Sequence, residues 1–305
     1  MKRFLLTIIL LLCAGAESAM AQPQVQIIHS YGTDYEPTVL CLLLRQGGFE
    51  NIRDKGENDQ QEAGPTNYSG TIYIGNTRYL REHYKAEMDS LRDEGYLICG
   101  DGTNLSLYGK GERGTLYAVY AFLEMLGYRL YTPDAMVVPD VSHLQLPKCH
   151  VVSNPAFEYR EVLYYYPNHS QLYADWHHLH TQADRERMYG MFVHTFSKLM
   201  KPSVYFDEHP EWYSLNGGRR MSDGQLCLSN PEVLEELCAR LADTMARRPE
   251  AKIWSVSPND NYNVCECDNC RRLADYIDYY NNKRIKLKLK MSPVQYRTHF
   301  CRQIN

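Results

Sequence analysis

The sequence of 305 residues has no apolar run of the roughly 18 residues that a transmembrane helix needs. It also has no excess of basic charge, because 33 Lys and Arg residues stand against 37 Asp and Glu residues. The resulting net charge of −4 gives no indication of a nucleic-acid partner. With 44% hydrophobic and 23% charged residues, the composition is that of a globular protein, and the length suggests about two domains.

Phe and Trp are scarce, with 8 and 3 copies, whereas Tyr occurs 25 times. Tyr combines an apolar ring with a polar tip, so an excess of Tyr suits a hydrated surface that binds carbohydrate. The alternative is a Tyr-rich core and surface without a ligand, and composition alone favours that alternative.

The N-terminus has the pattern of a secretory signal peptide. Two basic residues precede an apolar run over residues 4–13, and the small residues around Ala19 and Ala21 fit a cleavage site. We therefore expect a signal peptide over residues 1–21, cleaved before Gln22, and a periplasmic or extracellular protein.

Acidic residues are absent after Asp278, whereas residues 281–305 contain seven Lys and Arg residues. Such a tail could bind nucleic acid or an anionic membrane. We prefer a third interpretation, in which neither is a partner. The abrupt change in composition then indicates a tail of doubtful origin, as after a frameshift or a premature end.

Nine Cys residues would remain after removal of the signal peptide, an odd number for a disulfide framework. Cys265, Cys267 and Cys270 form a C-x-C-x-x-C pattern, and Cys227 is a candidate fourth member. Four thiolates can hold a structural zinc ion, but the same residues could form two disulfides or remain free thiols. No His lies nearby in sequence to activate a thiol, so we expect no catalytic role and no catalytic cofactor.

Residues 22–150 alternate strand-like and helix-like segments, which predicts a small α/β domain. Strands are expected at residues 25–29, 71–74, 96–99, 104–108 and 128–131, and helices at residues 36–45, 81–94 and 115–126. A turn from Gly100 to Gly102 predicts a hairpin between the third and fourth of these strands. Residues 47–68 and 137–155 are expected to form a polar loop and a connection.

Residues 151–280 repeat a strand, loop and helix pattern, which predicts the first part of a TIM-type (β/α)8 barrel. Strands are expected at residues 157–166, 187–196, 226–228 and 253–257, and helices at residues 231–248 and 268–280. The predicted fold class is therefore α/β, a small α/β domain followed by part of a barrel. About four strands instead of eight would leave two open edges, so either more chain was lost or the chain assembles with another.

A G-x-G-x-x-G pattern occurs at Gly109, Gly111 and Gly114, after a predicted strand and before a predicted helix. This pattern formally satisfies the dinucleotide-binding fingerprint. However, Glu112 would oppose a pyrophosphate, and an exported chain is separated from the cytosolic cofactors. We therefore expect these glycines to form a turn and to allow the helix to pack.

Catalytic side chains of barrels lie at the C-terminal ends of strands. This rule selects His194 after the second predicted strand, and Asn259, Asp260 and Asn261 after the fourth. Asp260 is the best candidate for a catalytic carboxylate or one that binds a sugar 2-hydroxyl, although a helix cap or a turn is an equal alternative. His194, Asn259 and Asn261 are candidates for substrate binding, and a satisfied buried His is the alternative for His194.

The loop over residues 205–213 mixes acids with aromatic residues, as a sugar site requires. Glu208 is a second catalytic candidate, with a solvated loop charge as the alternative. Trp212 and Tyr213 are candidates for stacking on a sugar ring, although packing of the loop is favoured for Trp212.

Several of these segments resemble known families. Residues 112–134 resemble the N-terminal domain of alpha-glucuronidases and hexosaminidases, in which this segment is structural. A second group of segments resembles a largely uncharacterised secreted bacterial family, glycoside-hydrolase-like, with a glycosidase-type barrel after such a domain. That group comprises residues 194–199, 209–212, 225–231, 256–261 and 265–270.

The resemblance covers about residues 25–280 and implies carbohydrate hydrolysis. It does not extend to the catalytic carboxylates of alpha-glucuronidases, which find no matching positions here. Our hypothesis is a secreted glycoside hydrolase-like protein that acts on a polysaccharide or glycan, including those with uronic acids. The alternative is a non-catalytic carbohydrate-binding protein or an inactive truncated remnant.

Overall fold

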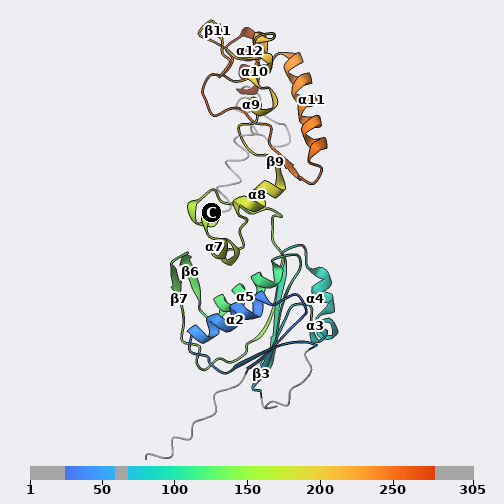
Figure 1. The fold of residues 1–305 in the computed structure, drawn as a ribbon, viewed down its shortest axis with the longest axis vertical. Helices are drawn as coiled ribbons and strands as arrows, with labels where there is room; N and C mark the ends of the chain where they lie inside the picture. The colour runs from blue at the N-terminus through green and yellow to red at the C-terminus, as the bar shows by residue number, and fades with distance from the viewer. Residues whose placement is uncertain (1–24, 59–67, 279–305) are drawn as a thin grey trace, which may run out of the picture. The chain divides into compact units, whose positions relative to one another are not determined.

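The computed structural model describes residues 25–58 and 68–278 of the chain. They form a mixed α/β structure that divides into two units after Gln182 (Figure 1). The predicted signal peptide and the basic tail lie outside the described residues. None of the helices in the described ranges has both the length and the apolar character needed to cross a bilayer.

The first unit is built on a six-stranded sheet with the order β2-β1-β3-β5-β4-β8. The strands are β1 (Val25–His29), β2 (Ile52–Gly56), β3 (Gly70–Ile74), β4 (Tyr96–Asp101), β5 (Asn104–Gly109) and β8 (Lys148–Ser153). Strands β2, β1, β3 and β5 are parallel, and β4 is antiparallel to both of its neighbours. The predicted hairpin is confirmed as β4 and β5, which pair from Tyr96 with Gly109 to Gly100 with Leu105.

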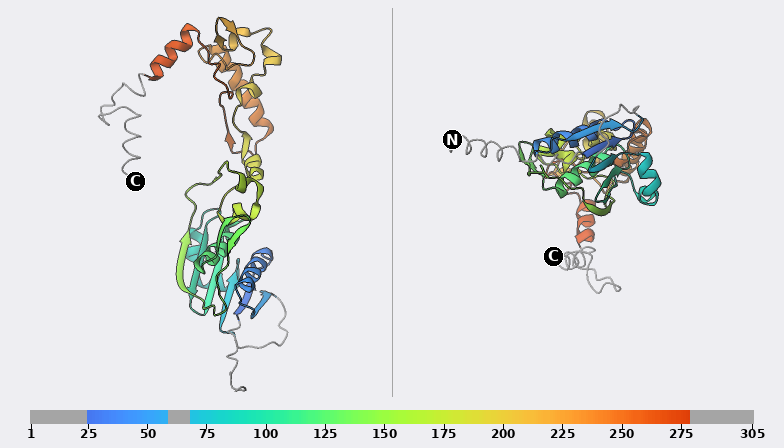
Figure 2. Two further views of the ribbon diagram at one scale, coloured as in Figure 1. Left: turned by 90° about the vertical axis from the view of Figure 1, so that its left-hand side faces the viewer. Right: turned by 90° about the horizontal axis from the view of Figure 1, so that it is seen from below.

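Helices cover both faces of this sheet (Figures 1 and 2). They are α2 (Tyr35–Gln46) and α5 (Gly114–Met125) on one face, and α3 (Arg78–His83) and α4 (Lys85–Ser90) on the other. Successive residues of β4 point to opposite faces. Ile98 therefore joins the core under α2 and α5, whereas Leu97 and Cys99 pack with Leu80 and Leu91 beneath α3 and α4.

Three predictions for the first unit differ from the structure. Strand β2 lies in the segment expected to be a loop, and β8 lies in the expected connection. Both are outer strands of the sheet with many partly exposed or exposed residues, so they lack the apolar pattern of its central strands. The helix expected at residues 81–94 is instead two short helices, separated by Tyr84 in a non-helical conformation.

The glycine pattern joins the end of β5 to the start of α5. A Cβ atom on Gly109 would lie 1.9 Å from the carbonyl carbon of Gly114. The Thr115 hydroxyl lies 3.2 Å from both the amide nitrogen and the carbonyl oxygen of Gly109. Within the described residues, the strand that follows α5, β6 (Arg129–Thr132), pairs with β7 (Ala135–Val137) and not with β5. This geometry supports the packing interpretation, because a dinucleotide fingerprint belongs to a β-α-β unit of one parallel sheet.

Residues after β8 also pack onto the first unit. Helices α6 (Tyr165–His169) and α7 (Gln171–Trp176) follow, and Trp176 lies in the apolar core with its indole N–H donating to Glu124 at 2.9 Å. The boundary between the two units falls after Gln182, whereas the sequence placed it at residues 150 and 151, inside β8.

The strand predicted at residues 157–166 is wrong. Most of this segment is irregular, and helix α6 begins at Tyr165. Its aromatic residues are not buried: Phe157, Tyr164 and Tyr165 are each more than 60% exposed. An apolar run of this kind resembles a core strand in sequence, but here it contributes little to the core.

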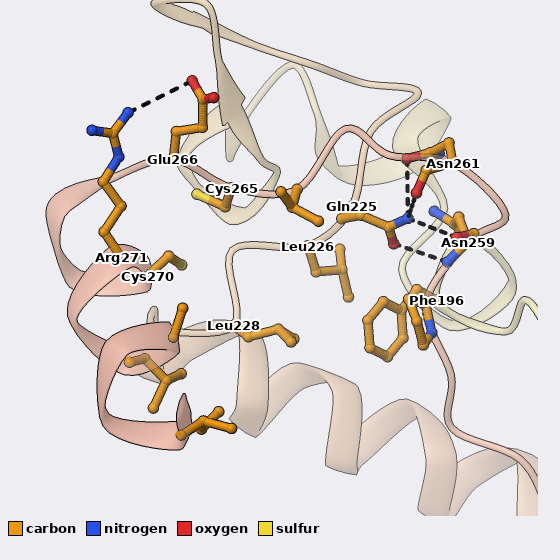
Figure 3. A pocket seen from close by; sticks show the side chains of 15 residues that line it. Phe196, Gln225, Leu226, Leu228, Asn259, Asn261, Cys265, Glu266, Cys270 and Arg271 are labelled. Carbon is orange, nitrogen blue, oxygen red and sulfur yellow. Dashed lines mark hydrogen bonds and ion pairs between the residues drawn. The ribbon is translucent and has the colours of Figure 1, made fainter. Parts of the chain in front are cut away.

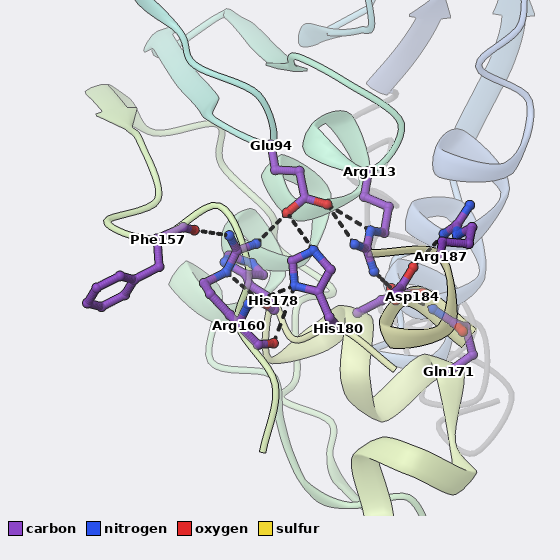
Figure 4. A network of polar contacts seen from close by, with 10 residues as sticks. Glu94, Arg113, Phe157, Arg160, Gln171, His178, His180, Asp184 and Arg187 are labelled. Carbon is purple, nitrogen blue, oxygen red and sulfur yellow. Dashed lines mark hydrogen bonds and ion pairs between the residues drawn. The ribbon is translucent and has the colours of Figure 1, made fainter. Parts of the chain in front are cut away.

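A partly buried ionic network binds the segment around Arg160 to the rest of the first unit (Figure 4). Glu94 accepts hydrogen bonds from Arg113 at 2.7 Å and from Arg160 at 2.6 Å, and His180 lies 3.6 Å away. Arg160 also donates to the backbone carbonyl oxygens of Phe157 and His178. Burial raises the pKa of Glu94, but the three basic side chains outweigh burial, so the pKa lies below its ordinary value. The carboxylate is therefore ionised in the folded chain.

We expect His178 to make the stability of the chain decrease with acidification. Burial, with help from the nearby Arg160 and His177, lowers the pKa of His178 to about 4. Between pH 6.5 and 4 the unfolded chain takes up a proton that the folded chain does not. The free energy of unfolding should then fall by about 1.4 kcal/mol per pH unit in this window.

The measurement is urea unfolding at several pH values, with the His178→Asn variant as the comparison. Asn tolerates the left-handed backbone found here, with φ of 55°, and does not titrate. Between pH 6.5 and 4, the free energy of unfolding of the variant should change less steeply with pH, by the equivalent of about one proton. Equal slopes for the two proteins would contradict this assignment.

The second unit contains a parallel pair of strands and helices that follow them. Its elements are α8 (Gln182–Met188), β9 (Tyr189–Met191), α9 (Phe196–Leu199), α10 (Pro202–Tyr205), η1 (Pro210–Trp212), β10 (Leu215–Asn216), β11 (Arg219–Arg220), α11 (Pro231–Arg247), β12 (Ile253–Trp254) and α12 (Asp268–Asp278). Strands β9 and β12 are parallel, and β10 and β11 form a short hairpin. The helices predicted at residues 231–248 and 268–280 correspond to α11 and α12.

The predicted barrel is not found in the described part of this unit. The strand expected at residues 187–196 is reduced to β9, and the strand expected at residues 253–257 to β12. Residues 226–228 form only one isolated bridge, from Leu226 to Tyr213. A core of eight buried residues from α9, η1, the segment before α11 and α11 itself stabilises the unit instead. Its members are Phe196, Leu199, Met200, Trp212, Tyr213, Leu226, Val233 and Leu237.

Candidate functional site

The loop over residues 257–263 follows β12, and the buried side chain of Gln225 binds it at two points (Figure 3). The Gln225 amide nitrogen donates to the carbonyl oxygens of Asn259 at 2.7 Å and Asn261 at 3.0 Å. Its side-chain oxygen accepts from the Asn259 backbone N–H at 2.9 Å. One side chain thus fixes both halves of the loop.

The two asparagines of this loop use their side chains to bind backbone groups. Asn259 donates to the Gly224 carbonyl oxygen at 2.9 Å and accepts from the Ser197 N–H at 3.1 Å. Asn261 donates to the Asp223 carbonyl oxygen and accepts from the Asn263 N–H, each at 3.0 Å. These bonds favour a structural role, so Asn259 and Asn261 position the loop and leave little amide capacity for a substrate.

Asp260 lies between these two asparagines and is exposed. Its carboxylate makes no hydrogen bond or ion pair with the residues that the structure describes, so it is available to a ligand. His194 lies beside the same loop, with its Nδ1 atom 3.3 Å from the Pro258 carbonyl oxygen. His194 has a left-handed backbone, with φ of 54°, next to Thr195, whose buried hydroxyl accepts from the Ser257 N–H at 2.9 Å. The structure therefore brings His194 and Asp260 to one fixed loop.

The aromatic candidates lie in the core of the second unit. The Trp212 ring is 8% exposed, stacks on His209 at 4.0 Å and donates to Glu232 at 3.0 Å. Tyr213 is 1% exposed and donates to the Met200 carbonyl oxygen at 3.1 Å. This packing supports the structural alternative for both rings.

Glu208 is exposed in the loop before η1, and in the described part of the chain no hydrogen bond or ion pair joins it to Asp260 or His194. The sequence predicted one site for Glu208, Asp260 and His194, but across the residues that the structure describes no bond joins Glu208 to the other two. His194 and Asp260 remain the exposed functional candidates beside the fixed loop.

The same loop borders a cavity of about 720 Å³ within the second unit (Figure 3). Gln225, Asn259 and Asn261 line one side of it, and Cys265, Cys270 and the charged residues Glu266 and Arg271 line the other. Apolar side chains of α12 and of the segment before α11 complete the lining. The cavity is therefore mostly apolar, with polar groups at two sides.

Four Cys residues come together beside this cavity. The sulfur atom of Cys227 lies 3.7 Å from those of both Cys267 and Cys270, and all four sulfur atoms, including that of Cys265, lie within 4.8 Å of one another. All four are free thiols. The structure thus groups the four residues that the sequence proposed, one before α11 and three around the start of α12.

The surroundings of the four thiols affect their acidities differently. Burial raises the pKa of Cys267, but hydrogen bonds from the Cys270 N–H and the Ser229 hydroxyl outweigh burial and lower the pKa to about 6. Burial raises the pKa of Cys265 to about 12 despite the Leu215 N–H, which donates to its sulfur at 3.4 Å.

Comparison with known proteins gives one family. Residues 130–288 match the model described as domain of unknown function DUF4838, which is more than half of the chain. The chain belongs to the DUF4838 family. A search of curated proteins finds no match.

A solved structure of a GH138 enzyme targeting pectin rhamnogalacturonan II is similar over 77% of this chain, at 14% sequence identity and a TM-score of 0.27. The DUF4838 chain spans about a quarter of that enzyme, 24% of its length.

The match to DUF4838 contains the whole candidate site, from His194 through Gln225 to Cys270. Sequence reasoning missed Gln225, which makes the largest number of bonds to the loop. The available signal was weak, a single polar residue immediately before the apolar Leu226 and two residues before Cys227. In the DUF4838 chain, the Gln225 side chain is buried and makes the hydrogen bonds that the loop backbone would otherwise make with water.

Proposed function

We propose that this DUF4838 chain is an exported glycoside hydrolase-like protein that acts on a polysaccharide or glycan, including glycans that bear uronic acids. The observation that carries the proposal is the exposed Asp260 carboxylate on a loop fixed after β12, the partner of β9 in a parallel pair. Ligands of parallel α/β structures bind outside the carboxyl ends of the strands. The resemblance of residues 112–134 to alpha-glucuronidases supports the choice of substrate class.

Hydrolysis of a glycosidic bond uses two carboxyl groups, an acid that protonates the leaving oxygen and a base or nucleophile on the other side. We assign one of these roles to Asp260 and propose Glu208 for the other. His194 would hydrogen-bond a hydroxyl or a carboxylate of the sugar from the same edge of the loop. The buried Trp212 and Tyr213 hold the surrounding chain and do not contact the sugar in this assignment.

The test is a screen of the purified chain against a panel of glycans with and without uronic acids, with release of reducing ends as the readout. We expect Asp260→Asn to lower turnover at least about 100-fold, since a positioned acid or base contributes 10²–10⁴. Glu235→Gln is the matched control, because Glu235 is also exposed but lies on α11. Unchanged turnover in Asp260→Asn would contradict the assignment.

A second candidate function is carbohydrate binding without catalysis. It is favoured by one observation: Asn259 and Asn261 line the cavity of about 720 Å³, whereas neither Asp260 nor Glu208 is among its lining residues. Binding of a glycan by the chain, without turnover and unaffected by Asp260→Asn, would support this function and exclude the hydrolase.

A further inference from the structure

We propose that Cys227, Cys265, Cys267 and Cys270 bind one structural zinc ion. The spacing of the four sulfur atoms and the groups around them support this site. The site is independent of the proposed action on glycans.

The spacing of the sulfur atoms fits tetrahedral coordination. With Zn–S bonds of about 2.3 Å, the sulfur atoms of a tetrahedral site lie about 3.8 Å apart. Cys227 lies 3.7 Å from both Cys267 and Cys270, and no two sulfur atoms of the four are more than 4.8 Å apart. These distances leave room for one ion at a common centre.

The same distances do not select a disulfide pairing. A disulfide joins two sulfur atoms at about 2.05 Å and consumes both thiols. Cys227 lies at the same distance from Cys267 and Cys270, so neither is its preferred partner. Equal distances between sulfur atoms are expected when all of them surround one metal ion and no two of them are bonded to each other.

Hydrogen-bond donors surround the sulfur atoms, as they do in metal–thiolate sites. The Leu215 N–H donates to Cys265 at 3.4 Å, and the Cys270 N–H donates to Cys267 at 3.5 Å. The Ser229 hydroxyl lies 3.1 Å from the sulfur of Cys270. These donors stabilise thiolates, the form of Cys that binds zinc.

The ion would have a structural task, because four thiolates leave no open position for a substrate or water. Helix α12 has no buried residue, so apolar packing contributes little to its placement within the second unit. Cys267 and Cys270 lie at its start, and Cys227 lies in the segment that leads to Pro231, the first residue of α11. One ion would therefore tie α12 and the loop before it to the segment that leads into α11.

The first measurement is metal content of the purified chain, with cobalt substitution as a spectroscopic check. We expect about one zinc per chain. We also expect Co²⁺ to give the visible absorption of tetrahedral thiolate coordination. Absence of bound zinc together with no uptake of added Zn²⁺ or Co²⁺ would overturn the proposal, and so would peptide mapping that shows disulfides among the four residues of the native chain.

Variants then identify the ligands. Cys267→Ser and Cys270→Ser should weaken zinc binding by more than about 100-fold, since even outer-shell partners of a metal are worth 10–100-fold. Cys238→Ser is the matched control, because Cys238 is an exposed free thiol on α11 outside the cluster. Retention of full zinc affinity in both ligand variants would contradict the site. The cobalt spectrum of the unaltered chain tests the proposal if a variant fails to fold.

Discussion

Replacement of Glu94 by Ala is expected to lower the free energy of unfolding by about 3–5 kcal/mol. The change removes the carboxylate that Arg113 and Arg160 share, and the side chains of all three are less than 20% exposed. Two partly buried guanidinium groups would then lose the carboxylate that they share, although Asp175 would still lie 3.8 Å from Arg113. Chemical unfolding of the purified chain near neutral pH measures the loss.

The backbone of Glu94 allows a matched control. Glu94 has φ of 57°, a left-handed conformation that costs a residue with a Cβ atom about 1–2 kcal/mol. Glu94→Gly also removes the carboxylate but adopts this conformation freely, so it should lose about 1 kcal/mol less than Glu94→Ala. A loss below about 1 kcal/mol in Glu94→Ala would show that the network does not stabilise the unit.

Lowering the pH should reproduce part of the loss of stability that follows removal of the Glu94 carboxylate. The folded chain holds the pKa of Glu94 below its ordinary value, so the stabilisation is complete above that ordinary value, about 4.3. It is lost as the pH falls through the lower pKa of the folded chain, because the unfolded chain takes up the proton first. In Glu94→Ala this contribution should be absent.

Replacement of Gly109 by Ala should be at least as severe, with a loss of more than about 3 kcal/mol or failure to accumulate folded protein. The added Cβ atom would lie 1.9 Å from the Gly114 carbonyl carbon. That neighbour is backbone at the start of α5, so it cannot rotate away as a side chain can. Either β5 or α5 would have to move, and both carry residues of the main core.

Gly32→Ala separates this clash from conformational strain. Gly32 has φ of 80°, and a Cβ atom there would meet nothing within 4 Å. Its replacement should therefore cost only about 1 kcal/mol. Similar losses for Gly109→Ala and Gly32→Ala in urea unfolding would contradict the close packing of β5 against α5.

The first unit was largely predictable because its core strands are short apolar runs that alternate with helices. The β4–β5 hairpin is the clearest case, since Gly102, with φ of 98°, occupies the turn that the sequence indicated. Strands β2 and β8 were missed because outer strands need few apolar residues. Sequence alone does not show which polar segment pairs with an existing sheet.

The chain after β8 was less predictable because its apolar segments do not all enter a core. The run at residues 157–166 has the composition of a strand but is largely exposed, whereas Trp212 and Tyr213 are buried. The Cys cluster was predictable in part, because three of its members are close in sequence. Only folding shows that Cys227, 38 residues earlier than Cys265, reaches the same point.

The loop around Asp260 is held in place without a ligand. Gln225 already fixes the backbone on both sides of Asp260 before any ligand arrives. A ligand of this carboxylate therefore does not have to order the loop, whose immobilisation would otherwise reduce the affinity by conformational entropy. The preorganisation resides in a buried amide that the ligand itself need not contact.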